Sequence, residues 1–592
     1  MSLPEILEAS VFLVENAALG RQPYPGMAAI YIMPASQAAI EVIAQDFTPP
    51  SKRLVSGRTG PMYASAHCFF TTSLSEGLLA ELARSPASPY VQTLQELFLD
   101  FVPAESRVYH LGRDAAHWQA VMGTPLIPDG PEPVAFGAEL DRMALQIASA
   151  CVNMGELPRV RFHRTTLDQR SARLAIRVQQ RLEELAARLE IRPSRTTTLV
   201  IVDRTVDLVA PLLHEFTVQA MATDLLPDGL GPDGTRYEYS VSTLAGPQKK
   251  TVSLDERDTL WTWLRHAHIA DCSNLIIERF NKFLTENKAA VKSRTTSAGE
   301  DVTSLAELKD TMAALGEFHE LKAEFSLHLS LAQDCLAASD RKKLIEVAEL
   351  EQDMVTGSTA AGETVKDAWQ ALAQLLARPA LESSDRARLL GLYLLTHTGS
   401  LGEADRKALF DSARLEPSDL AALRQLLVLA GAGGRSVANY RQRPSGRPRG
   451  SRRHSCLDDA PPYDVSRFQP ALKVIIEDCA HDELDAAEFP PVKADLGGSV
   501  GAAASAPRAL ATSLRARSSA GSAAGGGPAG GGASASTGSA TFVYVVGGCT
   551  YSEVRSVYEL ADQLKRDFFI GADAILTPRQ FLSRLGGSSS NN

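Results

Sequence analysis

Residues 199–226, LVIVDRTVDLVAPLLHEFTVQAMATDLL, carry the strongest structural signal in this chain. The stretch opens with four apolar residues in a row, as expected of a strand that is buried on both faces of a parallel sheet. A polar turn ends this strand, and a helical pattern of apolar residues follows from residue 211 onward. The turn contains Asp203, Arg204, Asp207 and Pro211. The helical pattern carries polar residues that a helix filling only a core does not need: His214, Glu215, Thr217, Gln219 and Asp224. The stretch therefore predicts a parallel-sheet protein with a specific structural signature after one central strand.

Composition limits the class of protein. A chain of 592 residues is too long for one hydrophobic core and predicts two to four domains. Its 60 basic and 70 acidic residues give a net charge of −10, which argues against nucleic acid as the main partner. No run approaches the ~18 apolar residues of a membrane span, and the opening MSLPEILEAS lacks the pattern of a signal peptide. The sequence predicts a soluble cytosolic protein that reaches membranes peripherally or through a partner.

The cysteines fit an intracellular location. They lie far apart, with no C-x-x-C pair among Cys68, Cys151, Cys272, Cys335, Cys456, Cys479 and Cys549. Scattered thiols in a large intracellular chain usually pack as small apolar side chains. We therefore expect no disulfide framework and no cysteine-based metal site, and no other motif predicts a cofactor.

The chain begins with alternating strands and helices. In the first part we predict strands at 10–14, 27–33, 64–70 and within 91–102, and helices at 36–47 and 75–84. In the second part we predict strands at 160–163 and 199–202, and helices at 134–153 and 167–190. Alternation of this kind implies α/β domains with doubly wound parallel sheets.

The rest of the chain changes in character. Residues 212–431 read as mostly helical, and residues 432–462 form a linker with seven arginines that we interpret as a solvated loop. Residues 496–540 are rich in Gly, Ala and Ser and are predicted to be disordered. The tail, 542–585, has a strand–helix–strand–helix pattern that is too short to bury its own strands. We assign its strands to the sheet of residues 106–211, so that the helical region is inserted into the second domain.

Two carboxylates after the central strand invite an enzymatic interpretation. Phosphotransfer enzymes often place carboxylates at a strand end, where Asp203 and Asp207 are found. Their spacing is four residues rather than two, and Arg204 lies between them. Structural ion pairs at a domain junction fit this pattern better. We predict that the three residues hold the strand end to the helical region, with a metal-dependent phosphotransfer enzyme as the alternative of another class.

Three other motifs are weaker candidates for chemistry. Residues 497–501 match G-x-S-x-G, but a nucleophile elbow needs a buried strand before it, and this match opens the low-complexity segment. The glycines at 547–548 precede a capping box at 550–553, so they are expected to form a tight turn and not a phosphate-binding loop. His266 and His268 are two residues apart, which on a helix points them ~200° apart. No catalytic residue and no metal site are predicted.

A heptad seam in the helical region predicts a binding surface. The 3-4-3 spacing of a coiled coil is found at Leu305, Leu308, Met312 and Leu315. The phase changes by one residue beyond Gly316, and glycine in a helix interior costs about 1 kcal/mol relative to alanine, so a bend is expected there. The segment 302–336 is either an ordinary intramolecular hairpin or a hairpin that presents its seam to a partner helix.

These motifs resemble those of the SM (Sec/Munc) family of syntaxin-binding proteins. Residues 199–226 are similar to the family pattern of an aliphatic strand, Asp-Arg, Asp, Pro-Leu-Leu-His-Glu, Gln-Ala-Met and Asp-Leu-Leu. Residues 254–270, LDERDTLWTWLRHAHIA, resemble the branch that serves plasma-membrane syntaxins, as do motifs within 351–367 and 542–582. The resemblance covers most of the chain. It implies a syntaxin- and SNARE-binding regulator of vesicle docking and membrane fusion in exocytosis, which chaperones SNARE assembly and is not an enzyme.

The resemblance implies an arch-shaped fold of three domains. Domain 1 (1–98) and domain 2 (99–211 and 467–592) are expected to be doubly wound parallel-sheet domains, and domain 3 (212–466) a mostly helical insertion. The first domain of the family usually opens with a helix and a strand before the position that matches Met1. Residues 1–98 are therefore expected to lack this opening unit.

Binding residues follow from the resemblance by position. A pocket for the N-terminal peptide of a syntaxin is implied on the outer face of domain 1, at Leu74, Leu79, Val91, Leu94 and Glu96. A syntaxin-binding cleft is implied at Glu15 and Arg21. The hairpin is expected to bind a vesicle SNARE through Leu305, Leu308, Met312, Leu315 and Gly316. Exocytic relatives carry a hinge proline near the last of these positions.

The implied partners are a syntaxin-type SNARE, the assembled SNARE complex and a vesicle SNARE, without nucleic acid. We expect a cytoplasmic monomer, peripherally associated with the plasma membrane through syntaxin. An SM protein of endosomal, vacuolar or Golgi trafficking is the alternative within the family, although the block at 254–270 argues against it. A tether that makes no SNARE contact is a further alternative.

Overall fold

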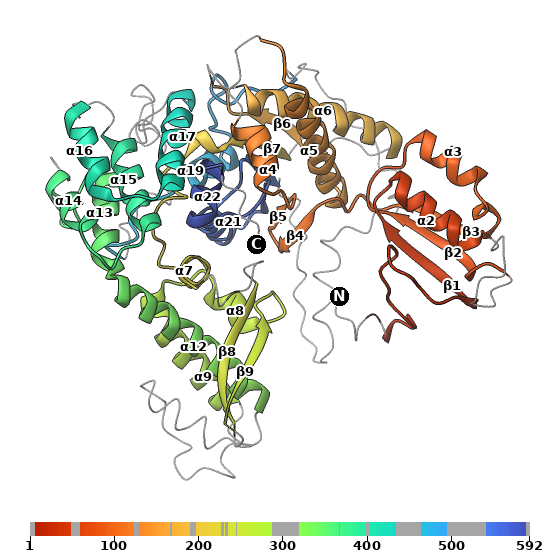
Figure 1. The fold of residues 1–592 in the computed structure, drawn as a ribbon, viewed down its shortest axis with the longest axis horizontal. Helices are drawn as coiled ribbons and strands as arrows, with labels where there is room; N and C mark the ends of the chain where they lie inside the picture. Colours follow the sequence, from red (N-terminus) through yellow and green to blue (C-terminus); the bar gives the residue numbers. More distant parts are fainter. Residues whose placement is uncertain are drawn as a thin grey trace.

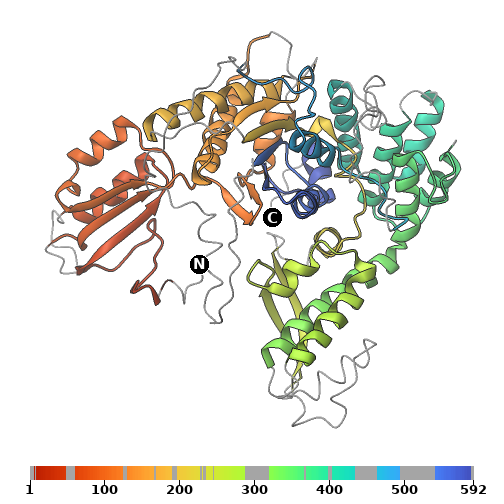
Figure 2. The ribbon, with the colours of Figure 1, turned by 180° about the vertical axis from the view of Figure 1, so that it is seen from behind.

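Three parts of the chain form an arch (Figure 1), which Figure 2 shows from behind. The structure is a computed structural model. It describes residues 6, 8–48, 60–123, 130–165, 169–189, 197–226, 230, 235–243, 246–286, 319–365, 368–397, 403–433, 463–493 and 540–587. Two of the three parts contain sheets in which every described strand pair is parallel except that of β4 (Val102–Glu105) with β5 (Val108–His110), and the third part is mostly helical, so the predicted fold class is confirmed.

The first part is a parallel sheet in the order β1-β2-β3 with two helices packed on it. Its elements are β1 (Tyr24–Met33), α2 (Gln37–Phe47), β2 (Tyr63–Phe70), α3 (Glu76–Arg84) and β3 (Val91–Glu96). Tyr31 lies opposite Cys68 in the register, and these side chains belong to one core with Ile40 and Ile43 of α2. The Ser36 side chain accepts a hydrogen bond from the Ala39 amide and so defines the start of α2.

The strand predicted at 10–14 is wrong. Residues 11–16 have no regular structure, and the side chains of Phe12, Leu13 and Val14 are 63%, 47% and 55% exposed. In the described part of the chain, β1 is the edge of the sheet and pairs only with β2. A short apolar run becomes a strand only where another strand satisfies its backbone groups, and this run lies beside none.

The second part is a six-stranded sheet in the order β4-β5-β11-β10-β7-β6. Its first elements are β4 (Val102–Glu105), β5 (Val108–His110), α4 (Ala115–Trp118), α5 (Val134–Asn153), β6 (Arg159–Phe162), α6 (Arg170–Leu189) and β7 (Thr198–Asp203). The C-terminal region adds α19 (Ala471–Ala480), β10 (Thr541–Val546), α21 (Tyr551–Leu564), β11 (Phe568–Ala572) and α22 (Pro578–Leu585). The tail strand β10 pairs in parallel with β7, which confirms the prediction that the tail adds strands to the earlier sheet.

Both faces of this sheet are buried, which explains the unbroken apolar run of β7. Leu199 and Ile201 belong to one core with α5 and α6, whereas Val200 and Val202 belong to a second core with α19 and α21. Successive side chains of a strand point to opposite faces, so a strand that is covered by helices on both sides needs apolar residues at every position.

The third part is mostly helical. Its helices are α7 (Val218–Leu225), α8 (Thr259–Leu264), α9 (Ile269–Glu286), α12 (His319–Lys342), α13 (Leu344–Thr356), α14 (Trp369–Leu376), α15 (Ser383–Thr396), α16 (Glu403–Ala413) and α17 (Pro417–Gly433). It also contains an antiparallel hairpin, β8 (Arg236–Thr243) and β9 (Gly246–Ser253), which the sequence analysis missed. The alternation in RYEYSVST was the available signal. Within the described residues, no helix is long and apolar enough to cross a membrane.

Candidate functional site

The signature after β7 is a buried ion pair between two distant parts of the chain. Arg204 directs two guanidinium nitrogens at the carboxylate of Glu553, at 2.8 and 2.7 Å, and both side chains are 1% exposed. The same guanidinium donates to the backbone carbonyls of Asp207 and Gly548. Burial alone lowers the pKa of Arg204, but the charge and hydrogen bonds of Glu553 raise the pKa above its usual value. Arg204 therefore keeps its positive charge in the folded protein.

The two aspartates of the signature are occupied by donors from the protein. Asp203 accepts the Ser171 hydroxyl at 2.8 Å. Asp207 accepts the amides of residues 209 and 210, each at 2.9 Å, and that of Ala471 at 3.0 Å. Both carboxylates are buried, and a metal ligand would need oxygens free of such bonds. The geometry opposes the phosphotransfer alternative.

The glycines after β10 form a tight turn and not a phosphate-binding loop. Gly547 and Gly548 have φ of +90° and +95°. A Cβ on Gly548 would lie 2.6 Å from a methyl group of Leu576. The predicted capping box is confirmed, since the Thr550 and Glu553 side chains accept from each other's backbone amides. Glu553 thus caps α21 and pairs with Arg204.

The role predicted for Asp203, Arg204 and Asp207 needs a correction. We predicted that they hold the strand end to the helical region. The turn Arg204–Val206 does pack against α17 of that region, but the described hydrogen-bond partners of the three side chains on other helices lie on α6, α19 and α21 of the sheet domain. The signature therefore joins the two separate parts of the sheet domain. The reason is topological: β10 lies beside β7, which brings the N-terminus of α21 against the end of β7.

His214 connects the segment that follows β7 with helices α13 and α15 of the helical region. Its amide and its Nδ1 lie 2.9 and 2.8 Å from the two carboxylate oxygens of Glu351 on α13, and its Nε2 lies 3.7 Å from Asp385 on α15. Burial and the nearby Arg388 lower the pKa of His214, but Glu351 and Asp385 outweigh them and raise it to about 9. His214 is therefore a buried imidazolium between two carboxylates.

Arg388 and Glu215 complete this junction. Arg388 donates to the carbonyls of residues 212 and 213, each at 2.7 Å, and to Asp224 at 2.8 Å. Glu215 lies 3.6 Å from Arg555 of α21, and burial raises the pKa of Glu215.

The helix predicted from residue 211 begins only at Val218. Pro211 is buried beside a small cavity of about 20 Å³ that Tyr551 and Pro578 also line. The backbone of residues 212–214 is used for contacts with α13 and α15 instead of helical hydrogen bonds. Tertiary contacts therefore override the helical pattern at this point.

The residues of the implied peptide pocket lie on neighbouring elements of domain 1. The Leu74 amide donates to one oxygen of Glu96 at 2.7 Å, and Arg188 of α6 pairs with the other oxygen. Leu79 on α3 and Leu94 on β3 are 43% and 42% exposed. Val91 is half-buried at the start of β3. The exposed leucines are available to a ligand, whereas Glu96 already has partners within the chain.

The two residues of the implied cleft have different surroundings. Glu15 is exposed in the irregular segment before β1. Arg21 binds both oxygens of Asp46, at 2.9 and 3.1 Å, and Asp46 also accepts the Tyr31 hydroxyl at 2.7 Å. Asp46 is a partner that was not predicted from the sequence. Asp46 precedes Phe47 on the buried face of α2, and a carboxylate on a buried face indicates that a partner is present.

The seam residues Leu305, Leu308, Met312, Leu315 and Gly316 lie outside the described residues, and the described chain resumes with α12.

The two histidines at 266 and 268 pack on Tyr558 and Tyr463. Burial lowers their pKa values to about 3 and about 4. Over the described ranges, no group of three His, Cys, Asp or Glu side chains is arranged to hold a metal ion.

Comparison with known proteins identifies the family. The Sec1 family matches residues 1–584. The chain is 31% identical over 589 residues to "Protein transport protein sec1" of Dictyostelium discoideum, covering 98% of this chain and 91% of that protein. It is 28% identical over 623 residues to "SNARE-interacting protein KEULE" of Arabidopsis thaliana, covering 98% and 88%.

The fold agrees with this match. The structure is similar to Unc18 in the crystal structure of the Unc18–syntaxin 1 complex from Monosiga brevicollis, with a TM-score of 0.76 and 24% sequence identity. The similarity covers 99% of this chain and 92% of that one. The resemblance of the signature at 199–226 and of the motifs around it therefore extends along almost the whole sequence. The chain belongs to the Sec1 family.

Proposed function

We propose that this protein binds a syntaxin-type SNARE and regulates vesicle docking and membrane fusion in exocytosis by chaperoning SNARE assembly. The observation that carries the proposal is the full-length match to relatives named for protein transport and SNARE interaction. The internal contacts support it. The buried Arg204–Glu553 pair holds the two parts of the sheet domain together, and the buried His214–Glu351 pair holds the segment after β7 to the helical region, as a rigid binding scaffold requires.

The proposal assigns no catalytic residue and no cofactor. We place the protein in the cytoplasm as a monomer, held peripherally at the plasma membrane by syntaxin. The assembled SNARE complex is the second partner in this scheme.

A binding panel tests the proposal. The purified chain is titrated with cytosolic regions of syntaxin-type SNAREs from the plasma membrane, the endosome and the Golgi. We expect the plasma-membrane protein to bind most tightly. Preference for an endosomal or Golgi syntaxin would assign the protein to that branch. Absence of all SNARE binding, together with magnesium-dependent phosphatase activity, would replace the proposal with the phosphotransfer alternative.

We further propose that the exposed leucines of domain 1 receive the N-terminal peptide of the syntaxin. Replacing Leu79 with arginine puts a charge where an apolar side chain of the peptide would be buried. We expect the affinity for the peptide to fall about tenfold. The measurement is fluorescence anisotropy with a labelled syntaxin N-terminal peptide.

Leu99→Arg is the matched control, because Leu99 has the same 43% exposure as Leu79 and lies outside the pocket. Undiminished affinity of a folded Leu79→Arg variant would remove the pocket from this proposal. An equal loss in the control variant would do the same.

The seam at 305–315 is proposed to contact a vesicle SNARE helix. Leu308→Asp is expected to slow SNARE-dependent fusion of liposomes, because an ionised group at a seam position cannot be buried against a partner. Ala306→Asp introduces the same charge off the seam and is expected to have little effect. Equal fusion rates for Leu308→Asp and the parent chain would argue that the seam is ordinary core.

A further inference from the structure

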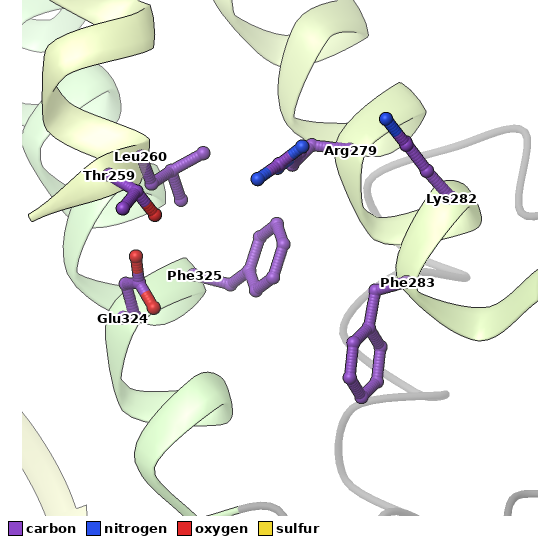
Figure 3. A pocket seen from close by; sticks show the side chains of 7 residues that line it. All are labelled: Thr259, Leu260, Arg279, Lys282, Phe283, Glu324 and Phe325. Atoms are coloured by element: carbon purple, nitrogen blue, oxygen red, sulfur yellow. The ribbon is translucent and has the colours of Figure 1, made fainter. Parts of the chain in front are cut away.

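A pocket of about 100 Å³ lies between α8, α9 and α12 in the helical region (Figure 3). It is lined by Thr259, Leu260, Arg279, Lys282, Phe283, Glu324 and Phe325. The sequence analysis singled out none of these as a site. The pocket belongs neither to the signature after β7 nor to the implied peptide pocket of domain 1.

Two free cations stand on one side of this pocket. Arg279 and Lys282 are exposed and lie one turn apart on α9. Among the described residues, neither makes an ion pair or a hydrogen bond. Two adjacent cations without a carboxylate or carbonyl partner create a local positive potential. An anionic group of a ligand would lower this potential and gain charge-assisted hydrogen bonds.

The floor of the pocket is apolar and rigid. Leu260 and Phe325 are each 3% exposed, and the ring of Phe325 packs edge-on against Phe280 at 5.4 Å. Phe283 is half-buried, and its ring lies 6.4 Å from that of Phe280, measured between centroids. A rigid aromatic surface offers an aliphatic side chain dispersion contacts without an ordering cost in the pocket.

The opposite wall carries an acidic residue that is already engaged. Glu324 lies close to Asp258, and burial together with this neighbour raises the pKa of Glu324. Asp258 caps α8 through the Trp261 amide and lies 2.7 Å from Nε2 of His328. The Glu324 wall offers an incoming carboxylate no cation, so the carboxylate is directed to Arg279 and Lys282, on the other side of the aromatic floor.

We propose that this pocket anchors an acidic residue and a neighbouring aliphatic side chain from one helix of a syntaxin-type partner. The inference rests on the proposed function and adds a contact in the helical region. A helix fits because side chains three or four residues apart lie on the same helical face, so that an acid reaches the cations while the aliphatic group reaches the phenylalanines. A free phosphate or a lipid headgroup fits less well, since it would leave the apolar floor uncovered and face Glu324.

Charge reversal tests the proposal. The probe is the cytosolic region of the syntaxin-type SNARE that binds the parent chain most tightly in the panel above. The double variant Arg279→Glu, Lys282→Glu is expected to bind this probe about tenfold more weakly, with a larger loss at low salt than at physiological salt. Both positions are exposed, so the variant is expected to fold like the parent. Phe283→Ala is expected to weaken binding to the same extent at both salt concentrations.

Lys250→Glu is the matched control, because Lys250 is an exposed lysine of the same region on β9 that does not line the pocket. It is expected to bind the probe like the parent chain. Restored affinity between the reversed variant and a probe in which one acidic residue of its helix is changed to lysine would identify the contacting acid.

Three outcomes would overturn the inference. Unchanged affinity of the double variant would show that the cations do not contact the partner, while the proposed function would stand. An equal loss for Lys250→Glu would indicate only a general effect of net charge. A change in the sedimentation of the chain alone upon reversal would assign the pocket to contact between copies. If the parent chain binds no syntaxin-type SNARE at all, both proposals fail together.

Discussion

Replacing Arg204 with alanine is expected to destabilise the protein by about 3–5 kcal/mol. The substitution leaves the carboxylate of Glu553, which is 1% exposed, without its only described cation. It also leaves the carbonyls of Asp207 and Gly548 without a donor that the intact chain provides. An unpaired buried charge is among the largest single penalties that a substitution can impose.

The measurement is the urea midpoint of unfolding together with the melting temperature of the purified variant. Arg181→Ala is the control, because Arg181 forms an exposed ion pair with Glu184 and its loss is expected to change stability by about 0.5 kcal/mol or less. The double variant Arg204→Met, Glu553→Leu removes both charges and is expected to be more stable than Arg204→Ala. A melting temperature of Arg204→Ala equal to that of the parent would refute the structural role of the pair.

The position of the Arg204–Glu553 pair explains why its loss is expected to destabilise the whole sheet domain and not only the turn after β7. Arg204 follows β7, and Glu553 begins α21 in the C-terminal tail, 349 residues further along the chain. The tail supplies β10 and β11, the two central strands between β7 and β5. Loss of the pair therefore weakens the attachment of β10 and β11 to the six-stranded sheet.

Local patterns in the sequence were sufficient to predict several features of the fold. The apolar run at 199–202 predicted a strand buried on both faces, because such a strand can tolerate no polar side chain. The shortness of the tail predicted that its strands join an earlier sheet, and β10 does pair with β7. The capping box at Thr550 was predicted because its two residues are only three positions apart.

Features that depend on distant partners could not be predicted in the same way. The sequence pattern predicts that His214 belongs to a helix. In the structure its amide instead donates to the carboxylate of Glu351, 137 residues away, which no local pattern indicates. The partner of Arg204 was expected in the helical region because nothing local indicates that β10 lies beside β7. Arg279 and Lys282 look like an ordinary solvated helix face, and only the packing of α8, α9 and α12 shows that they border a pocket.

The second large effect is expected in the dependence of stability on pH, through His214. In the folded protein its imidazole lies between Glu351 and Asp385, with Arg388 as the nearby cation, and its pKa is raised to about 9. The pKa of Asp385 is held below its usual range and that of Arg388 above its usual value, although burial opposes both shifts. Neither of these two groups titrates between pH 6.5 and 9, so within this cluster of three the histidine carries the change there.

The sign of the effect follows from the order of the two pKa values. Below the unfolded value of about 6.5, the histidine is protonated in both states and its stabilisation is fully present. As the pH rises from about 6.5 to 9, the unfolded state loses the proton first, so the free energy of unfolding falls. Since one pKa unit corresponds to about 1.4 kcal/mol, the loss is expected to be about 3 kcal/mol.

The experiment is urea unfolding at pH 6.5 and pH 9, followed by the fluorescence of the four tryptophans of the chain. One of them, Trp369, has its ring centroid 6.4 Å from that of Tyr393, on the helix that carries Asp385. His214→Gln keeps a polar side chain that cannot be protonated, so this variant is expected to be less stable than the parent at pH 6.5 and nearly equal to it at pH 9. His481→Gln, at the partly exposed end of α19, is the control and should follow the parent at both values. A constant difference between His214→Gln and the parent across this range would mean that the histidine carries no charge in the folded state. The helical region would then be held to His214 by hydrogen bonds alone, and the burial of Glu351 would need an explanation other than an ion pair with this histidine.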